Sequence, residues 1–134
     1  MTKTRVGDPF LSAHEYGRSL PKFTVNLLVR NVETSLRFYR DVLGFQLTSR
    51  DYVARFDVDG VLFELVPNPR NNPLPGTGNA RLSLEVADIR RATAALEARG
   101  VTTTPVRQEP GGMLSYFQDP DGNELCLWQY TVQG

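Results

Sequence analysis

DGVLFEL at residues 59–65 and DGNELCL at residues 121–127 are two versions of one short pattern. Each begins with Asp-Gly, which favours a tight turn, and continues with residues that are typical of a strand. They differ at the sixth position, where the first stretch has Glu64 and the second has Cys126. The two stretches therefore predict a chain that contains one unit twice, with the two copies different at this position.

The residues around each stretch repeat the same order of elements, namely a strand, a helix and three strands. In the first half, the spacing predicts these elements over residues 23–30, 32–44, 45–51, 53–58 and 61–66. In the second half, it predicts them over residues 80–86, 87–100, 101–108, 113–119 and 124–130. Asn31 and Asp88 stand at the two helix starts, and both are residue types that cap helices. Each half therefore reads βαβββ.

These elements divide the chain into an extension at 1–21 and a single domain at 22–130. Within the domain we expect module one at 22–67, a linker at 68–79 that is rich in Pro, Gly and Asn, and module two at 80–130. One module is too short to bury a core alone, so the two modules are expected to pack together.

Composition restricts the partners of this protein. The 134 residues include 15 basic and 15 acidic side chains, so the formal net charge is zero. Because no basic run is present, nucleic acid and anionic membranes are poor partners. A single cysteine fits a reducing compartment, and the N-terminal residues lack the apolar core of a signal peptide. We expect a cytoplasmic protein.

Strand phase gives each sheet two different sides, because successive side chains point to opposite faces. In the first strand, Val25 and Leu27 share the side expected beneath the helix, and Thr24 and Asn26 share the other. The strands at 61–66, 80–86 and 124–130 show the same division. The second side is therefore a mixed polar and aromatic face, which is either simply wet or a binding surface.

Three stretches resemble the vicinal oxygen chelate superfamily, which contains glyoxalases, bleomycin-resistance proteins and extradiol dioxygenases. LLVRNVETSLRFYRDVLGF (27–45) resembles its first strand and helix, LSLEVADIRRATAALEARGV (82–101) its second, and SYFQDPDGNELCLW (115–128) its closing hairpin. The resemblance implies an α+β fold in which two βαβββ modules form one curled eight-stranded mixed sheet with a concave cavity for the ligand. It also implies a homodimer.

Metalloenzymes of that family usually take ligands from four positions, on the first and fourth strands of each module, and the typical set is His or Gln, Glu, His and Glu. In this sequence those positions hold Thr24, Glu64, Arg81 and Cys126, of which only Glu64 matches. The Arg81 guanidinium keeps its proton and repels a cation. The one histidine, His14, lies in the extension and is expected at the surface. We therefore expect neither a metal nor another cofactor.

The mixed faces and the resemblance together give a set of candidate ligand-binding residues. They are Thr24, Asn26, Glu64, Arg81, Ser83, Tyr116, Cys126 and Trp128. Because Glu64 and Arg81 occupy convergent positions in the family, we expect them close together, either as a structural ion pair or with Arg81 free to bind an anionic group of a ligand. Cys126 is expected to be a small buried filler, since no histidine is available to activate it.

Two further features have open interpretations. The aromatic residues Tyr116, Trp128 and Tyr130 either stack on a flat ligand or pack in the core or at a dimer interface. Gly111 and Gly112 form either a mobile rim loop or a simple turn.

The leading hypothesis is a metal-free protein of the bleomycin-resistance-like type that holds or sequesters a small organic molecule in the cavity. The alternative is a glyoxalase- or dioxygenase-like lyase or oxygenase, with an atypical metal site or with Glu64 as general base. A third class is a purely structural or regulatory dimer. The catalytic residues of the alternative are unknown.

Overall fold

A computed structural model describes residues 23–68 and 80–131. The predicted extension and all of the predicted linker except residue 68 lie outside these ranges, so their boundaries stay predictions. Within the described ranges, no helix has the length and apolar character needed to cross a membrane.

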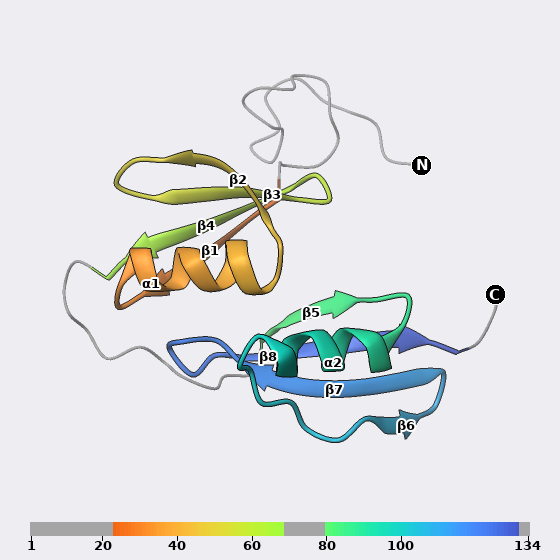
Figure 1. The fold of residues 1–134 in the computed structure, drawn as a ribbon. Coiled ribbons are helices and arrows are strands. Elements are labelled where there is room, and N and C mark those ends of the chain that lie inside the picture. Colours follow the sequence, from red (N-terminus) through yellow and green to blue (C-terminus); the bar gives the residue numbers. More distant parts are fainter. Residues whose placement is uncertain (1–22, 69–79, 132–134) are drawn as a thin grey trace, which may run out of the picture.

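Module one consists of a helix and a four-stranded sheet (Figure 1). Its elements are β1 (Thr24–Val29), α1 (Val32–Arg37), a π-helical continuation η1 (Phe38–Val42), β2 (Gln46–Arg50), β3 (Ala54–Val58) and β4 (Val61–Pro67). The strand order is β1-β4-β3-β2, with β1 parallel to β4 and the other pairs antiparallel.

Module two repeats this plan. Its elements are β5 (Leu82–Glu85), α2 (Ile89–Ala98), β6 (Arg107–Glu109), β7 (Gly112–Gln118) and β8 (Glu124–Tyr130). The order β5-β8-β7-β6 matches that of module one, again with the first and last strands parallel. The predicted N-caps are also equivalent, because the side chains of Asn31 and Asp88 accept hydrogen bonds from the backbone N–H groups of Thr34 (2.9 Å) and Arg91 (3.1 Å). The predicted repeat and the α+β class are confirmed.

The strand predicted over 101–108 is much shorter than expected, because β6 begins only at Arg107. Pro105 has no N–H group to donate to a ladder. The segment is instead held to β7 at Thr104, whose N–H donates to the Tyr116 carbonyl (2.9 Å) and whose carbonyl accepts from the Ser115 hydroxyl (2.6 Å). A loop therefore replaces most of this strand.

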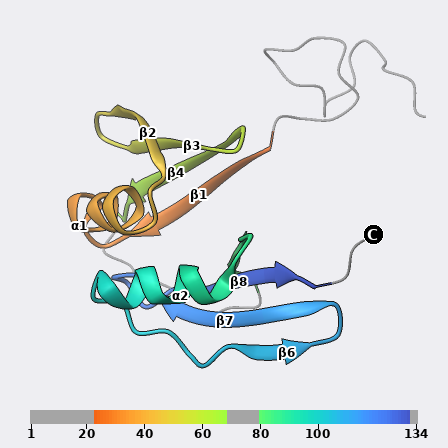
Figure 2. The ribbon, with the colours of Figure 1, turned by 45° about the vertical axis from the view of Figure 1, so that its right-hand side comes forward.

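The eight strands form two sheets of four within one chain, and not the single eight-stranded sheet that the family resemblance implied. Both ribbon views show α1 and α2 lying between the two sheets (Figures 1 and 2). One hydrophobic core joins the helix sides of both sheets, from Val29 and Leu65 in module one to Leu125 and Leu127 in module two. The predicted strand phase is confirmed, since Phe63 and Leu65 are buried and the alternate residue Glu64 is not.

Aromatic rings fill the core of module one and reach across to module two. The Phe63 ring contacts those of Tyr39, Phe45 and Phe56, with centroids 5.0, 5.8 and 6.0 Å away. The Phe38 ring lies 6.4 Å from that of Phe117 on β7. The two modules therefore share one packed interior rather than being joined by a linker alone.

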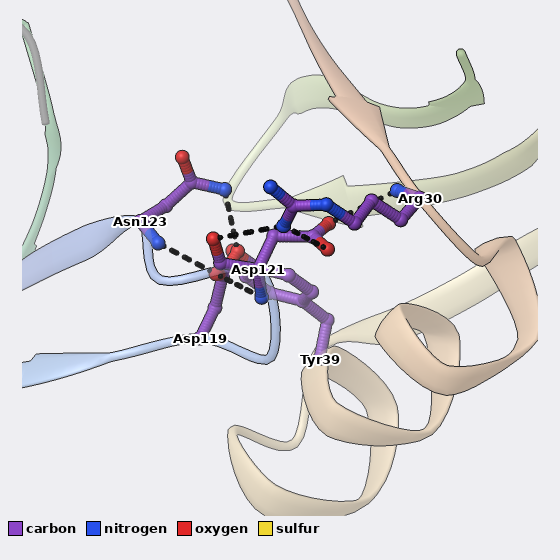
Figure 3. A network of polar contacts seen from close by, with 5 residues as sticks. All are labelled: Arg30, Tyr39, Asp119, Asp121 and Asn123. Carbon is purple, nitrogen blue, oxygen red and sulfur yellow. Dashed lines mark hydrogen bonds and ion pairs between the residues drawn. The ribbon is translucent and has the colours of Figure 1, made fainter. Parts of the chain in front are cut away.

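A network of hydrogen bonds beside this core connects the first helix to the turn before β8 (Figure 3). The Tyr39 hydroxyl donates to Asp119 Oδ2 (2.7 Å), and the same carboxylate accepts from the backbone N–H groups of Asp121 and Asn123, each at 2.9 Å. Arg30 at the end of β1 donates from its backbone and its guanidinium to the Asp121 carboxylate, each at 3.2 Å. Burial, with Asp119 adding to it, raises the pKa of Tyr39 far above its usual range, so the hydroxyl stays a donor.

Replacing Tyr39 with Phe should destabilise the protein by about 1–3 kcal/mol, because a buried carboxylate loses one of its donors while its other bonds remain. Urea unfolding followed by circular dichroism measures the change. Tyr52→Phe is the matched control, since Tyr52 is exposed and should tolerate the loss of its hydroxyl. Equal stability of the Tyr39→Phe variant and the wild type would show that the hydrogen bond from Tyr39 to Asp119 does not contribute to the free energy of unfolding.

Candidate functional site

The mixed sides of the two sheets point outward in opposite directions, because the helix sides face one another through the shared core (Figure 2). We call the outer side of the first sheet face one. It comprises Thr24, Asn26, Leu28, Arg55, Leu62, Glu64 and Val66. We call the outer side of the second sheet face two. It comprises Arg81, Ser83, Glu85, Leu114, Tyr116, Glu124, Cys126, Trp128 and Tyr130.

Glu64 is the centre of face one, and both of its oxygens have partners. Oε2 accepts from Arg55 Nε at 3.0 Å, and Oε1 accepts from the Asn26 amide. Arg55 also donates to Asp51 at 3.0 Å, and this carboxylate, followed by Glu64, raises the pKa of the Arg55 guanidinium. Only 19% of the Glu64 side chain is exposed. The carboxylate is therefore held in place by neutral and cationic donors.

Arg81 and Tyr116 dominate one end of face two. The guanidinium carbon of Arg81 lies 4.7 Å from the centroid of the Tyr116 ring, a cation–π geometry. Arg81 Nη1 also donates to Glu124 Oε1 at 2.9 Å. Of the Arg81 side chain, 45% remains exposed, and a guanidinium has five N–H donors, so this group can still receive an anion.

The middle of face two is formed by Cys126 and Trp128 on β8. Cys126 pairs in register with Ser83 on β5 and Tyr116 on β7. It is only 5% exposed, and its thiol donates to the Leu127 carbonyl at 3.4 Å. The Trp128 indole lies edge-on to the Tyr130 ring, with centroids 5.6 Å apart. This placement agrees with Cys126 as a buried filler and leaves the aromatic rings as the larger surface.

The predicted proximity of Glu64 and Arg81 is wrong within one chain. Glu64 pairs with Arg55, whereas Arg81 pairs with Glu124, and the two residues belong to sheets whose outer faces point apart. The prediction assumed that all four strands of the site belong to one sheet. The structure brings Asn26 to Glu64 in module one, and Ser83, Tyr116 and Cys126 together in module two.

The four metal-ligand positions of the family are divided between the two faces of one chain. Thr24 and Glu64 lie on face one, and Arg81 and Cys126 lie on face two. Residues 23–68 and 80–131 contain no group of three or more His, Cys, Asp and Glu side chains placed to hold an ion. His14 lies outside the described residues. A guanidinium, a hydroxyl and a buried thiol beside one carboxylate do not fit a divalent cation.

Hollows in the described part of the chain lie at the junction of the modules. One, of about 640 Å³, is lined by Phe38 and Val42 of η1 and by residues of the loop at 99–104 and of β7. Another, of about 480 Å³, has an apolar wall made by β1, β5 and the start of β8. Tyr116 lines the first hollow and Arg81 and Ser83 line the second, whereas Glu64, Cys126 and Trp128 line neither of these two.

Two contributors to these faces were missed by sequence reasoning. Arg55 could have been found, because the Asp59-Gly60 turn sets the register that places Arg55 opposite Glu64. Glu124 was placed on the mixed side by phase, but its pairing with Arg81 depends on side-chain conformations that phase does not determine.

The chain resembles known proteins over most of its length. The model of the Glyoxalase/Bleomycin resistance protein/Dioxygenase superfamily matches residues 23–127. The uncharacterised protein YaeR of Escherichia coli (strain K12) is 30% identical over 120 residues, which cover 78% of this chain and 92% of YaeR.

Solved structures also resemble the chain over most of its length. The integron cassette protein HFX_CASS4, from the mobile metagenome of Halifax Harbour sewage outfall, has a TM-score of 0.69 and 26% identity, and covers 81% of this chain and 97% of its own. TnmS3, an antibiotic binding protein from Streptomyces sp. CB03234, has a TM-score of 0.65 and 26% identity. The similarity covers 82% of this chain and 97% of TnmS3.

The thiol of Cys126 should react slowly with a thiol-specific reagent in the folded protein, because its sulfur is buried beneath face two. In urea the reaction should become fast and reach one thiol per chain, since the sequence has a single cysteine. Absorbance with Ellman's reagent measures both rates. Fast stoichiometric reaction of the folded protein would show an accessible, reactive cysteine instead.

Proposed function

This chain belongs to the Glyoxalase/Bleomycin resistance protein/Dioxygenase superfamily, and we propose that it is a metal-free protein that binds a small organic molecule against its outer faces. The observation that carries the proposal is the chemistry of face two, where Arg81 and the rings of Tyr116 and Trp128 stand at family ligand positions or beside them. Aromatic walls with a few placed polar groups are typical of small-molecule sites.

The residues of face two suit a flat molecule better than an ion. The rings of Tyr116 and Trp128 offer stacking surface on two sides of the small Cys126. Arg81 offers charged donors at one end of this surface. TnmS3, described as an antibiotic binding protein, has this fold at 26% identity, which supports a binding role for the present chain.

We further propose that two chains form the complete site as a homodimer. β1 and β5 are edge strands, each paired on one side only among the described strands, so each has a free backbone edge. Pairing β1 of one chain with β5 of another would produce an eight-stranded sheet and bring face one beside face two. The exposed apolar residues Phe23 (73%) and Leu28 (47%) lie at or beside β1, where such a contact would cover them.

The alternative is a lyase or oxygenase that uses Glu64 as general base. A base must release its lone pair to a substrate proton. Both Glu64 oxygens already accept hydrogen bonds, one from the Asn26 amide and the other from the Arg55 guanidinium, so neither stands free to accept a substrate proton. Binding without catalysis is therefore the better-supported function. We retain the cytoplasm as its expected location, and nucleic acid and membranes as poor partners.

Ligands of face two should be found by the fluorescence of Trp128, because the sequence has only one tryptophan. A screen of aromatic carboxylates should give a ligand that changes this emission. Arg81→Ala should then weaken its binding by roughly tenfold or more, since a charge-assisted pair is lost.

Tyr52→Ala is the control, as Tyr52 is an exposed aromatic residue outside both faces, and its loss should leave affinity unchanged. Equal affinity of the Arg81→Ala variant and the wild type for every ligand found would contradict a binding role for face two.

The purified protein should contain no stoichiometric divalent metal, because its four family positions offer only one carboxylate and a repelling guanidinium. Elemental analysis measures the content, and added Zn²⁺, Ni²⁺ or Mn²⁺ should leave the melting temperature unchanged. One metal ion per chain, lost on Glu64→Gln substitution, would establish a metal site and favour the enzyme alternative.

A further inference from the structure

We infer that Gly112 is a positioning residue for the Trp128 indole and so determines which ligands face two accepts. The effect of Gly112 on ligand choice rests on the proposed function, whereas its effect on the position of the indole does not. Gly112 begins β7, and its position on that strand is buried and belongs to the outer side of the sheet.

A side chain at residue 112 has no room. A Cβ atom there would lie 2.4 and 2.8 Å from the Cζ2 and Cε2 atoms of the Trp128 indole, and 2.5 Å from the Gln129 carbonyl oxygen. Real Cβ atoms do not approach other atoms so closely. The indole therefore lies directly on the backbone of β7, in space that every other residue type would fill.

The neighbouring glycine has a different requirement. Gly111 adopts a φ of +84°, in the left-handed region, and a Cβ atom there would meet nothing within 4 Å. Gly111 is a turn glycine, whereas Gly112 is required by a side-chain contact. Of the two interpretations that the sequence left open, a turn is observed at Gly111, whereas Gly112 already belongs to β7.

This contact sets the direction of the indole. Gly112 pairs in register with Tyr130, and the Trp128 ring lies 5.6 Å from the Tyr130 ring. The indole thus leans along β8 toward Tyr130 and away from Cys126. Any side chain at residue 112 would lift the ring off the sheet, into the space that a flat ligand on face two would use.

The position of the indole is tested without a ligand. Gly112→Ala should shift the Trp128 emission to the red and increase its quenching by acrylamide, because the lifted ring meets more water. Gly111→Ala is the matched control, since it strains the turn but leaves the indole in place. The same emission and quenching in both variants would overturn the inference.

A double-mutant cycle separates the loss of stability caused by the clash with the indole from the loss caused by the clash with the Gln129 carbonyl. Gly112→Ala should lower the urea midpoint of the wild type, and should lower it less in a Trp128→Leu background, where the colliding ring atoms are gone. Equal losses in the two backgrounds would assign the requirement for glycine to the carbonyl, and the positioning role would fail.

Ligand selection is tested with 8-anilinonaphthalene-1-sulfonate, a flat aromatic anion. It should bind the wild type and Gly111→Ala alike and bind Gly112→Ala several-fold more weakly. If the indole moves but the probe binds all three proteins equally, Gly112 does not select ligands. If binding is also unchanged in Arg81→Ala and Trp128→Leu, the proposed function of face two fails as well.

Discussion

The rest of this structure depends on one constraint, which is that the helix-covered sides of both sheets are buried in one shared core. The hydrogen bond between Tyr39 and Asp119 connects the two modules beside this core. Each sheet has one apolar side that must leave water. Within a single chain the two apolar sides cover one another, with α1 and α2 between them. The outer sides then face away from each other, whatever residues they contain.

This arrangement allows the two copies of the repeat to differ at Glu64 and Cys126. The two residues are equivalent in register, since Glu64 pairs with Asn26 on β1 and Cys126 with Ser83 on β5. Each lies at the centre of a separate outer face with its own neighbours. Glu64 is surrounded by Arg55 and Asn26, whereas Cys126 is buried and pairs in register with Ser83 and Tyr116. The two positions therefore do not have to carry the same chemistry.

Much of the fold was predictable from local pattern. The two Asp-Gly turns, the caps at Asn31 and Asp88 and the alternation along the strands each depend on residues close in sequence. The orientation of the modules was not predictable in this way, because it depends on contacts such as Tyr39 with Asp119, 80 residues apart. The candidate residues were placed on the correct sides of their strands, but the Glu64–Arg81 pair was wrong because it required one continuous sheet. The role of Gly112 depends on the conformation of one indole, which no sequence pattern encodes.

The central claim is that face one and face two meet only between chains, and contact quenching of Trp128 by a nitroxide tests it most directly. In a Cys126→Ser background, a nitroxide is attached at Thr24→Cys on face one of chains that also carry Trp128→Phe. These chains are mixed with unlabelled chains that retain Trp128. We expect quenching in this mixture, and none in chains that carry both the label and Trp128 when they are diluted into excess unlabelled Trp128→Phe chains. Quenching within single chains, with none between chains, would contradict the account.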